Sequence, residues 1–324
     1  MIHLVLLVLA LVLDRAVGDP PWLWRRVPHP VVIFGKGIDL FEHRLNRTTF
    51  TADGRRLNGV VTILVLLGLS VLAGALLSAA TSRLGLPGVA VEVVVIAVFL
   101  AQKSLGDHVL AVADGLGRSG LAGGREAVAM IVGRDPNTLD QSGVCRAAIE
   151  SLSENFADGV VAPVFWYAVA GLPGLLAYKM LNTADSMIGH KNERFVDFGW
   201  ASARLDDLAN WPAARLSAGL IALAAALRLG AAAGRRSLSA ALRDSGLHRS
   251  PNSGWPESAM AGALDLQLAG PRIYGGVRVS EPMMHAAGRN LSTAADIRTG
   301  VVVFYTACSL LAALTAFLAL ASNA

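Results

Sequence analysis

Hydrophobic residues along this chain fall into long runs that polar stretches separate. The runs 60–80 and 300–323 contain no charged residue, and each is long enough for a membrane-spanning helix of roughly 20 residues. The run 86–102 is interrupted only by Glu92 and follows the run before it after a short turn, TSRLG, so the two predict a helical hairpin. The segments predicted to lie in a membrane are 1–13, 60–80, 86–102, 159–178, 212–229 and 300–323.

The first of these runs is short for a span and is followed by charge instead of preceded by it, which is unlike a signal peptide. We therefore interpret 1–13 as an uncleaved first membrane helix. The prolines between 20 and 30 exclude one continuous helix through that stretch. His29, which lies between two of them, is predicted to have a structural role.

The run 159–178 allows two interpretations. It is uncharged, but Pro163 and the sequence GLPG at 171–174 interrupt a helix there. Basic residues are abundant before residue 60, so the positive-inside rule places 14–59 and 103–158 in the cytoplasm and both termini outside. If 159–178 spans the membrane, the basic residues from Lys179 onward lie outside. A re-entrant hairpin would keep both flanks in the cytoplasm, and the charge pattern favours it.

Composition also indicates a membrane protein. Of the 324 residues, 54% are hydrophobic and 16% are charged, with a mean hydropathy of +0.52, whereas a soluble domain carries nearer a quarter charged residues. We expect an all-α, polytopic integral membrane protein with about four to six membrane helices and long polar cytoplasmic loops, organised as one domain over 1–324. The net charge of +4 comes without a block of basic and aromatic residues, so nucleic acid is not an expected partner. Cys145 and Cys308 are predicted to be free thiols.

Ionisable residues crowd together between 133 and 211, on both sides of an apolar run. Such groups next to membrane-length segments are candidates for a functional site. In SENFADG, Glu154 and Asp158 are four residues apart and share one face of a helix. With Asn155 they offer the oxygen ligands that Mg²⁺ prefers. The alternative is a solvated helix end that Asn155 and Asp158 cap.

The sequence NTADSMIGHKNE, at 182–193, is the more specific signal. Asn182 and Asp185 lie within one predicted helical turn, and Gly189 ends the helix. The loop that follows carries His190, Lys191 and Glu193. A metal ligand, a proton acceptor and a cation for phosphate are therefore available within a short stretch. The alternative is that His190 lies at the membrane interface and that Lys191 extends toward water.

Three further motifs offer ligands. DDLAN, at 206–210, resembles a short acidic motif that binds Mg–diphosphate, although a first helical turn also favours Asp. GRDPNTLD, at 133–140, predicts a turn from which Arg134 can bind a phosphate or carboxylate. SPNSGWPES, at 250–258, is too rich in Pro, Gly and Ser for a predicted helix. Its candidate binding residues are Asn252, Ser253, Trp255 and Glu257, with Trp255 against a flat ligand.

Together the motifs resemble one family. They are DPPWLWRRVPHPV, GRDPNTLD, ESLSENFADGVVAPVFW, YKMLNTADSMIGHKNE and SPNSGWPESAMAGAL, and the resemblance that they carry extends from Asp14 to about Tyr274. The chain resembles the adenosylcobinamide-phosphate synthases, also called cobinamide synthases, of cobalamin biosynthesis. The resemblance implies a multi-pass enzyme of the cytoplasmic membrane. Its expected substrates are adenosylcobyric acid and (R)-1-amino-2-propanol or its O-phosphate, joined by an amide on the f-position propionate, and other enzymes of the pathway are expected partners.

The chemistry that the resemblance implies assigns a role to each candidate. A carboxylate is a poor acyl donor, so we expect ATP as co-substrate to form an acyl phosphate, with Mg²⁺ on the phosphoryl oxygens and no tightly bound cofactor. No P-loop signature occurs, so the nucleotide site must be of another kind. The amine must lose a proton before it attacks, and the tetrahedral oxyanion needs donors. The expected residues are Glu154, Asp158 and Asp185 for the metal; Lys179, Lys191 and Arg134 for phosphate; His190 or Glu193 as base; Asn155 and Asn182 for the oxyanion; and Trp255, Trp166 and Tyr167 around the corrin.

Three alternatives remain. A corrinoid transporter component would also place charge and proline-broken helices in the membrane, but most polar motifs lie in predicted loops and no internal repeat is visible. A membrane prenyltransferase would explain the NxxD and DDxxN pairs, yet it should have more full-length spans. A scaffold for pathway enzymes would not explain so many ionisable groups near the bilayer.

Overall fold

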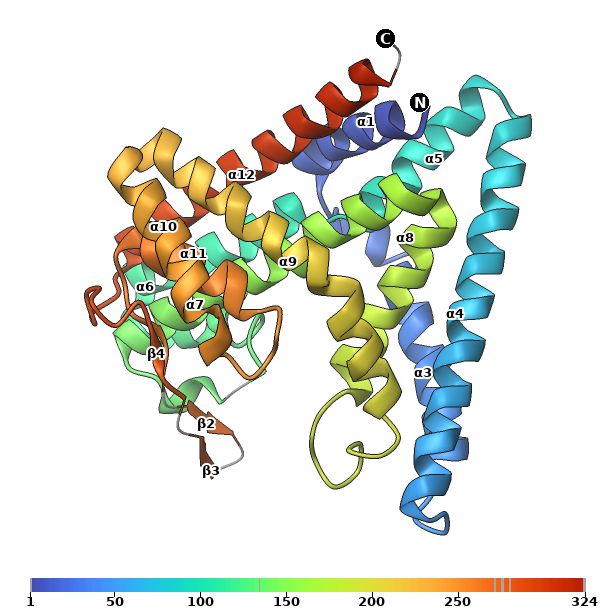
Figure 1. Ribbon diagram of the computed structural model, residues 1–324, viewed down its shortest axis with the longest axis horizontal. Coiled ribbons are helices and arrows are strands. Elements are labelled where there is room, and N and C mark those ends of the chain that lie inside the picture. Colours follow the sequence, from blue (N-terminus) through green and yellow to red (C-terminus); the bar gives the residue numbers. More distant parts are fainter. Residues whose placement is uncertain (1, 134, 271, 275–276, 280, 323–324) are drawn as a thin grey trace. The chain divides into compact units, whose positions relative to one another are not determined.

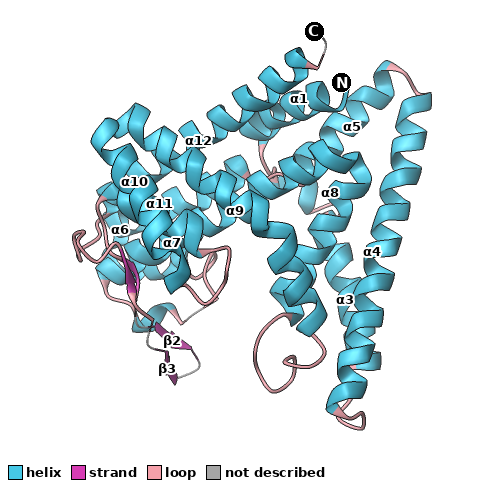
Figure 2. Ribbon diagram, viewed as in Figure 1, coloured by secondary structure: helices cyan, strands magenta, loops and turns pink. Residues whose placement is uncertain are grey.

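The protein is almost entirely helical (Figures 1 and 2). The structure is a computed structural model and describes residues 2–133, 135–270, 272–274, 277–279 and 281–322. Within these residues, five helical segments are long and apolar enough to cross a membrane, judged by length and composition. The predicted all-α, polytopic membrane fold is confirmed. The five segments are Ala52–Arg83, Leu86–Val128, Gln141–Ile188, Trp200–Leu229 and Ala294–Ala321.

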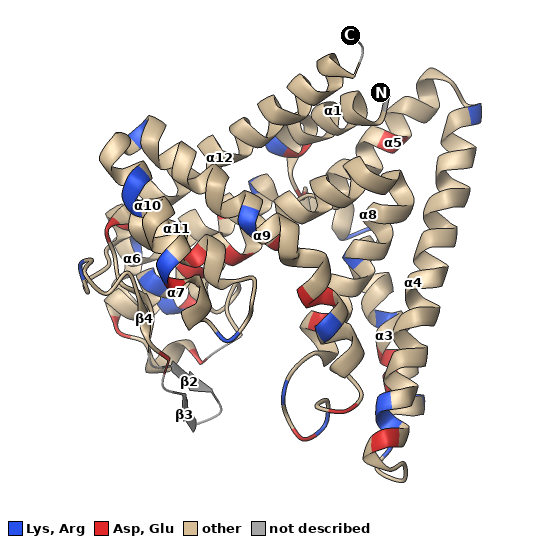
Figure 3. Cartoon of the chain, in the orientation of Figure 1, with Lys and Arg blue, Asp and Glu red and all other residues tan. Residues whose placement is uncertain are grey.

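Each predicted membrane segment from residue 60 onward falls within or largely within one of these five. The first predicted segment lies in a helix of 16 residues, Ile2–Val17, which is shorter than the others. Figure 3 shows that the middle of the helix Ala52–Arg83 and most of the helix Ala294–Ala321 carry no charged residue.

The chain forms two compact units, each discontinuous in sequence. Unit 1 comprises Met1–Leu100, Ala162–Asn210 and Leu318–Ala324, and unit 2 comprises Ala101–Val161 and Trp211–Phe317. Unit 1 contains α1 (Ile2–Val17), α2 (Pro21–Trp24), α3 (Pro30–Leu45), α4 (Ala52–Arg83), α5 (Leu86–Val98), α8 (Ala162–Ile188) and the first part of α9 (Trp200–Leu229). The break before α3 agrees with the prolines, because Pro30 is the first residue of that helix.

Unit 2 is mostly helical as well. It contains α6 (Gln102–Val128), α7 (Gln141–Phe156), a π turn (Ala157–Val161), the rest of α9, α10 (Ala231–Asp244), α11 (Gly254–Leu264) and most of α12 (Ala294–Ala321). Single 3₁₀ turns lie at Pro136–Thr138 and Ser245–Leu247. Two antiparallel ribbons pair β1 (Leu268–Ala269) with β4 (Met283–Met284) and β2 (Arg272–Tyr274) with β3 (Val277–Val279). The polar stretches after 102 and 230 were predicted as loops, yet the first is largely helical, and α10 and α11 occupy part of the second.

The motif SPNSGWPES corrects a prediction. We did not expect a helix there, but α11 begins at Gly254, inside the motif. Pro256 occupies the first turn, where a backbone N–H has no partner within the helix, so its missing N–H costs nothing. Trp255 and Glu257 therefore lie on the first turn of a helix instead of in a loop.

The tetrapeptide Gly-Leu-Pro-Gly forms a sharp helix corner at two places in unit 1. It occurs at 85–88 and 171–174, and Gly85 and Gly171 both have φ +61°. A residue with a Cβ is strained in that conformation, whereas glycine is not. The first corner separates α4 from α5, and the second bends α8 at Ala170–Gly171. The sequence analysis found no repeat and missed this one. The predicted interruption of 159–178 is real, and its re-entrant path through a membrane stays a prediction.

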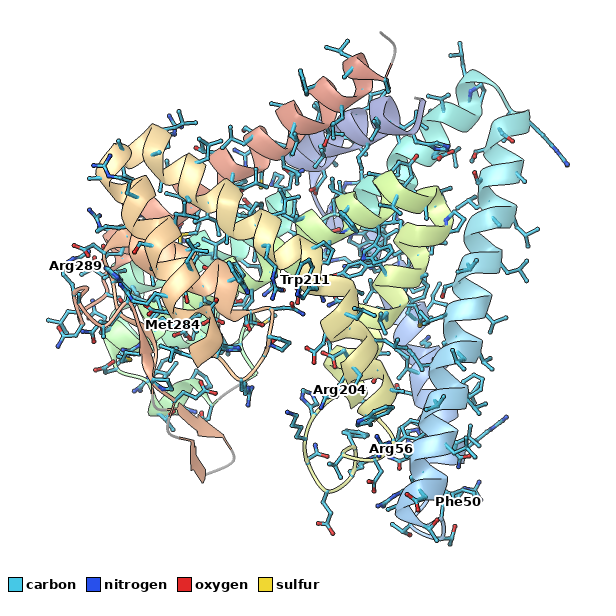
Figure 4. All side chains as sticks on the ribbon, in the orientation of Figure 1. Phe50, Arg56, Arg204, Trp211, Met284 and Arg289 are labelled. Atoms are coloured by element: carbon cyan, nitrogen blue, oxygen red, sulfur yellow. The ribbon has the colours of Figure 1, made fainter. Side chains whose placement is uncertain are left out.

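Helix α4 packs on α8 through a stripe of small residues. Its buried positions include Ser70 and Gly74, four residues apart, the spacing that lets two helix backbones approach closely in membranes. A Cβ on Gly74 would lie 2.6 Å from the Pro173 Cα atom, on the corner of α8. At the other end of the same helix, the guanidinium carbon of Arg56 lies 3.8 Å from the centre of the Trp200 ring (Figure 4).

Gly74→Val should lower the free energy of unfolding of the protein by about 1–3 kcal/mol, the usual cost of overpacking. The new side chain meets the backbone of Pro173, which cannot move aside as a flexible side chain does. Gly68 provides the control, since nothing lies within 4 Å of a Cβ built on it in the same helix. Unfolding of both variants in detergent checks this expectation, and equal midpoints for Gly74→Val and Gly68→Val would contradict it.

Candidate functional site

Carboxylates and amides from two helices meet in unit 1. Asp185 lies on the last turn of α8, and the DDLAN motif lies on α9. The Asn210 amide donates to Asp206 Oδ2 over 2.9 Å, and the Tyr178 hydroxyl donates to Asn210 Oδ1 over 2.8 Å. Asp185 lies within electrostatic range of two DDLAN carboxylates, and the Asn182 amide interacts with one of them. We call this group the acidic cluster: Asn182, Asp185, Asp206, Asp207 and Asn210.

The acidic cluster has the donors of an Mg²⁺ site. Carboxylate and amide oxygens are the ligands that this hard cation prefers. Asp206 is only 8% exposed, and its Oδ1 atom has no hydrogen-bond partner within the described residues. A buried carboxylate oxygen without a partner is costly, so a cation at this position would remove a penalty. The residues therefore fit the metal that the sequence analysis expected, with Asp185 as the member it named.

The loop after α8 carries the second group of predicted residues. The helix ends at Ile188, and the Gly189 N–H donates to the Asp185 carbonyl over 2.7 Å, as the sequence predicted. His190, Lys191 and Glu193 are all exposed in this loop. His190 lies within electrostatic range of Asp185, and Lys191 lies within range of Asp207. The loop thus brings an imidazole and a cation close to the acidic cluster.

Two ion pairs fasten this loop to α3 and α4. Arg194 forms a bidentate salt bridge with Glu42, in which Nε donates to Oε1 over 3.0 Å and Nη2 donates to Oε2 over 2.7 Å. Arg55 Nη2 lies 2.5 Å from Asp197 Oδ2. A planar guanidinium that binds both oxygens of a carboxylate fixes orientation as well as distance. The loop that carries His190 is therefore held to two helices through Arg194 and Asp197. The sequence analysis assigned no role to the four charged residues of these two ion pairs.

The Glu42–Arg194 pair predicts a pH dependence. Burial raises the pKa of Glu42, but hydrogen bonds from Arg194 and Asn46 and the charge of Arg194 outweigh it, so the pKa lies below its usual value. A carboxyl whose pKa is lowered on folding adds stability above its unfolded pKa and loses it as the pH falls through the lowered value. Wild type should therefore unfold at a higher temperature than Glu42→Gln at pH 7, and the difference should shrink below about pH 4. A difference that persists unchanged into that acid range would contradict the role of Glu42.

In unit 2, Glu154 has neighbours other than those expected. It lies on the last turn of α7, and one of its carboxylate oxygens lies within 4.8 Å of ligand atoms of His248 and Glu257. Asp158 follows in the π turn, a kind of distortion that is frequent at functional sites. Asp185 belongs to unit 1. The metal set Glu154, Asp158 and Asp185 stays a prediction, while the structure joins Glu154 to a histidine that the sequence analysis did not consider.

Asn252 and Trp255 contact an arginine from α9. Arg215 Nη1 donates to Asn252 Oδ1 over 2.8 Å, and the guanidinium carbon lies 4.9 Å from the centre of the Trp255 ring. The same carbon lies 4.6 Å from the ring of Trp211. Arginine over an aromatic face is a favourable cation–π contact. The Ser253 N–H donates to Ser250 Oγ over 3.3 Å, which shapes the turn before α11.

Other predicted residues have these positions. Asn155 is exposed, and its amide donates to the Ser151 carbonyl over 2.9 Å. Lys179 lies on α8 within electrostatic range of His29. The turn predicted from GRDPNTLD is confirmed by the 3₁₀ turn at Pro136–Thr138, and Arg134 lies outside the described residues.

Two of the aromatic residues predicted to lie around the corrin use their polar atoms inside unit 1. Tyr167 is fully buried, and its hydroxyl donates to Glu92 Oε1 over 2.8 Å, so the prediction that it contacts the corrin is wrong. The Trp166 indole N–H donates to the Ala209 carbonyl over 3.1 Å. They were proposed as flat partners for the corrin, and the polar atom of each makes a hydrogen bond inside unit 1.

The structural role predicted for His29 is confirmed. Its Nδ1 accepts from the Val31 N–H and its Nε2 lies 3.2 Å from the Val98 carbonyl oxygen, which caps α3 and joins it to the end of α5. Burial lowers the pKa of His29. A neutral ring with the proton on Nε2 satisfies both contacts, since one nitrogen accepts and the other donates.

Comparison with known proteins identifies the family. The family described as CobD/Cbib protein matches residues 7–304, nearly the whole chain. The chain belongs to this family. It is similar to proteins named cobalamin biosynthesis protein CobD: 64% identical to that of Sinorhizobium fredii over 97% of this chain and 96% of the relative, 65% identical to that of Rhizobium meliloti over 95% and 94%, and 46% identical to that of Rhodobacter capsulatus over 92% of each. No solved structure matches the chain.

Proposed function

We propose that this CobD/Cbib family member acts in cobalamin biosynthesis and forms an amide bond. In this proposal it joins the f-position propionate of adenosylcobyric acid to aminopropanol or to its O-phosphate, with ATP as co-substrate. The product is adenosylcobinamide or its phosphate. Family membership over residues 7–304 supports the pathway, and the acidic cluster beside a lysine-bearing loop is the observation that supports ATP-dependent chemistry.

The acidic cluster suits the activation step. When bound there, Mg²⁺ would neutralise phosphoryl oxygens and so favour attack of the substrate carboxylate on ATP. Asp185 and Asp206 would hold the cation, and Lys191 and Lys179 would bind phosphate as point charges. The propionate oxygen attacks the terminal phosphorus, the bond to ADP breaks, and an acyl phosphate remains.

The loop at 189–199 suits the second step. The amine of aminopropanol must be deprotonated to attack the acyl carbon, and His190 or Glu193 would accept that proton. Asn182 would donate to the oxyanion that forms. Inorganic phosphate then leaves with the oxygen that linked it to the acyl carbon, and the amide remains. The ion pairs of Arg194 and Asp197 hold the loop in position for this transfer.

We further propose that the protein lies in the cytoplasmic membrane and that its active site is on the cytoplasmic side. The basic segment 14–59 supports this orientation through the positive-inside rule, and ATP is a cytoplasmic substrate. The orientation can be tested with the variant Glu193→Cys in sealed right-side-out and inverted vesicles. A thiol reagent that does not cross the membrane should modify this cysteine only in the inverted vesicles. Labelling from the outer face of right-side-out vesicles would contradict the proposal.

The experiment that tests the function uses purified protein in detergent. Adenosylcobyric acid, Mg-ATP and either aminopropanol or its O-phosphate are supplied, and products are followed by mass. We expect a cobinamide product with one amine and release of ADP. The transporter alternative predicts instead that vesicles containing the protein accumulate labelled corrinoid without any amine. No product with either amine from folded protein, together with such uptake, would overturn the proposal in favour of transport.

A further inference from the structure

Three potential metal ligands from separate parts of unit 2 converge at one point. They are Glu154 at the end of α7, His248 in the turn before α11, and Glu257 on the first turn of α11. One donor atom of each lies within 4.8 Å of the other two, and His248 Nε2 lies 3.6 Å from Glu257 Oε1. Glu154 and His248 are 94 positions apart in sequence, yet they share one centre with Glu257. We call these three residues, Glu154, His248 and Glu257, the Glu–His–Glu centre.

The separation of these atoms fits a bound cation better than direct contact. A nitrogen and an oxygen that share a hydrogen bond lie about 2.7–3.2 Å apart, so the 3.6 Å between His248 and Glu257 is too long for one. Two ligands on one metal ion, with bonds of about 2.0–2.2 Å, lie roughly 3–4 Å apart. The observed spacing requires only a small closure around an ion.

Burial adds a second argument. The side chain of His248 is 4% exposed and that of Glu257 is 0% exposed, while Glu154 is partly exposed. Glu257 is removed from water and the carboxylate of Glu154 lies close to it, so a divalent cation between the two would offset their mutual repulsion. The partly exposed Glu154 leaves one side of the centre accessible, which is how a cation would enter.

The residue types select the kind of cation. Mg²⁺ takes oxygen ligands and keeps several waters, whereas imidazole suits Zn²⁺, Fe²⁺ and related transition metals. We infer that the Glu–His–Glu centre binds one divalent transition-metal ion of the zinc type, separate from any Mg²⁺ that the acidic cluster takes with ATP. Three protein ligands leave at least one coordination position for water or a substrate oxygen, as in catalytic zinc sites.

The histidine ring also shows what binding changes. Nδ1 of His248 lies 3.0 Å from the Ser250 N–H, from which it accepts, and 3.4 Å from the Ser250 carbonyl oxygen. A metal on Nε2 requires the proton to reside on Nδ1, which then donates to that carbonyl. Partners on the second ring nitrogen commonly orient a metal-binding histidine in this way. On binding, the ring therefore exchanges the hydrogen bond from the Ser250 N–H for one to the Ser250 carbonyl oxygen, in the turn that leads into Asn252.

Metal binding can be measured without substrates, so its failure would be distinct from failure of the proposed function. Full-length protein is freed of metal with a chelator and titrated calorimetrically with Zn²⁺ and separately with Mg²⁺. We expect one Zn²⁺ per chain at this centre, bound at least about 100-fold more tightly than Mg²⁺, and a loss of about 100-fold or more in His248→Gln. The control His43→Gln changes an exposed histidine on α3 and should bind Zn²⁺ as wild type does.

A measurement on the unaltered protein protects the test against a variant that fails to fold. Cu²⁺ replaces Zn²⁺ in wild type, and electron paramagnetic resonance then reports whether a nitrogen atom coordinates the ion. We expect coupling to one imidazole nitrogen, lost in His248→Gln and kept in His43→Gln. Zn²⁺ affinity equal to that for Mg²⁺, no nitrogen coupling in wild type, or unchanged Zn²⁺ affinity in folded His248→Gln would each overturn the inference.

Discussion

Asp185→Asn should slow cobinamide formation by at least about 100-fold, the scale on which a metal site loses function when its ligand shell is damaged. Asp185 lies on the last turn of α8, within electrostatic range of both DDLAN carboxylates and of His190, so its charge acts on the other proposed metal ligand and on the proposed base. The amide keeps the size of the side chain and removes its charge. Turnover by purified protein, with amounts matched by absorbance, is the measurement.

The matched control for this variant is Asp53→Asn, because Asp53 is an exposed carboxylate on the first turn of α4 in the same unit. The substitution is chemically the same, and we expect little change in rate. Asp185→Asn protein that is folded and fully active would refute the metal role of Asp185. A loss of activity that accompanies an equal loss in Asp53→Asn would mean that unit 1 responds to any change in charge.

The second large effect concerns the stability of unit 1. Glu92 is 7% exposed within an apolar helix, and its two oxygens accept from the Tyr167 hydroxyl over 2.8 Å and from the Thr81 hydroxyl over 2.9 Å. Glu92→Leu should lower the free energy of unfolding, because the buried Tyr167 hydroxyl left without an acceptor costs about 1–3 kcal/mol, whereas the Thr81 hydroxyl keeps the Ser78 carbonyl oxygen at 3.1 Å. Glu92→Gln retains an acceptor for Tyr167 and should cost clearly less.

Thermal unfolding of both Glu92 variants in one detergent measures this difference. A Glu92→Leu protein as stable as wild type would show that a leucine at this apolar position compensates fully for the lost hydrogen bonds. Catalytic rates at a temperature where both variants are folded serve as the control. We expect them to stay close to that of wild type, since Glu92 belongs to none of the proposed catalytic groups.

Much of the fold follows from local sequence. Uncharged runs of membrane length predict the long helices, Gly189 predicts the end of α8, and the prolines up to Pro30 predict the interruption before α3, because these signals act on the residues around them. The failure at SPNSGWPES has the same origin. Proline was counted as a helix breaker there, but the first turn of a helix tolerates it, and the sequence does not mark which position of a helix Pro256 will take.

The sequence identified candidate residues for the sites but did not show which of them lie together in space. NTAD and DDLAN were recognised separately, yet only the packing of α8 on α9 joins Asp206 to Asp185. Glu154 was grouped with Asp158 because they are four residues apart, while its neighbour in space, His248, lies far along the chain in a stretch without helical periodicity. The ion pair of Glu42 with Arg194 also depends on distant residues. Long-range contacts of this kind leave no periodic signal in one sequence.

The measurement that tests the central claim most directly follows the oxygen atoms. Adenosylcobyric acid labelled with ¹⁸O in the f-position carboxylate is converted with Mg-ATP and the amine, and the label in the phosphorus-containing products is measured by mass. Activation as an acyl phosphate transfers one labelled oxygen to inorganic phosphate and leaves the other in the amide. We predict labelled phosphate in an amount equal to the cobinamide formed. Label in AMP would indicate an acyl adenylate, and amide formation without label in either product would contradict the account.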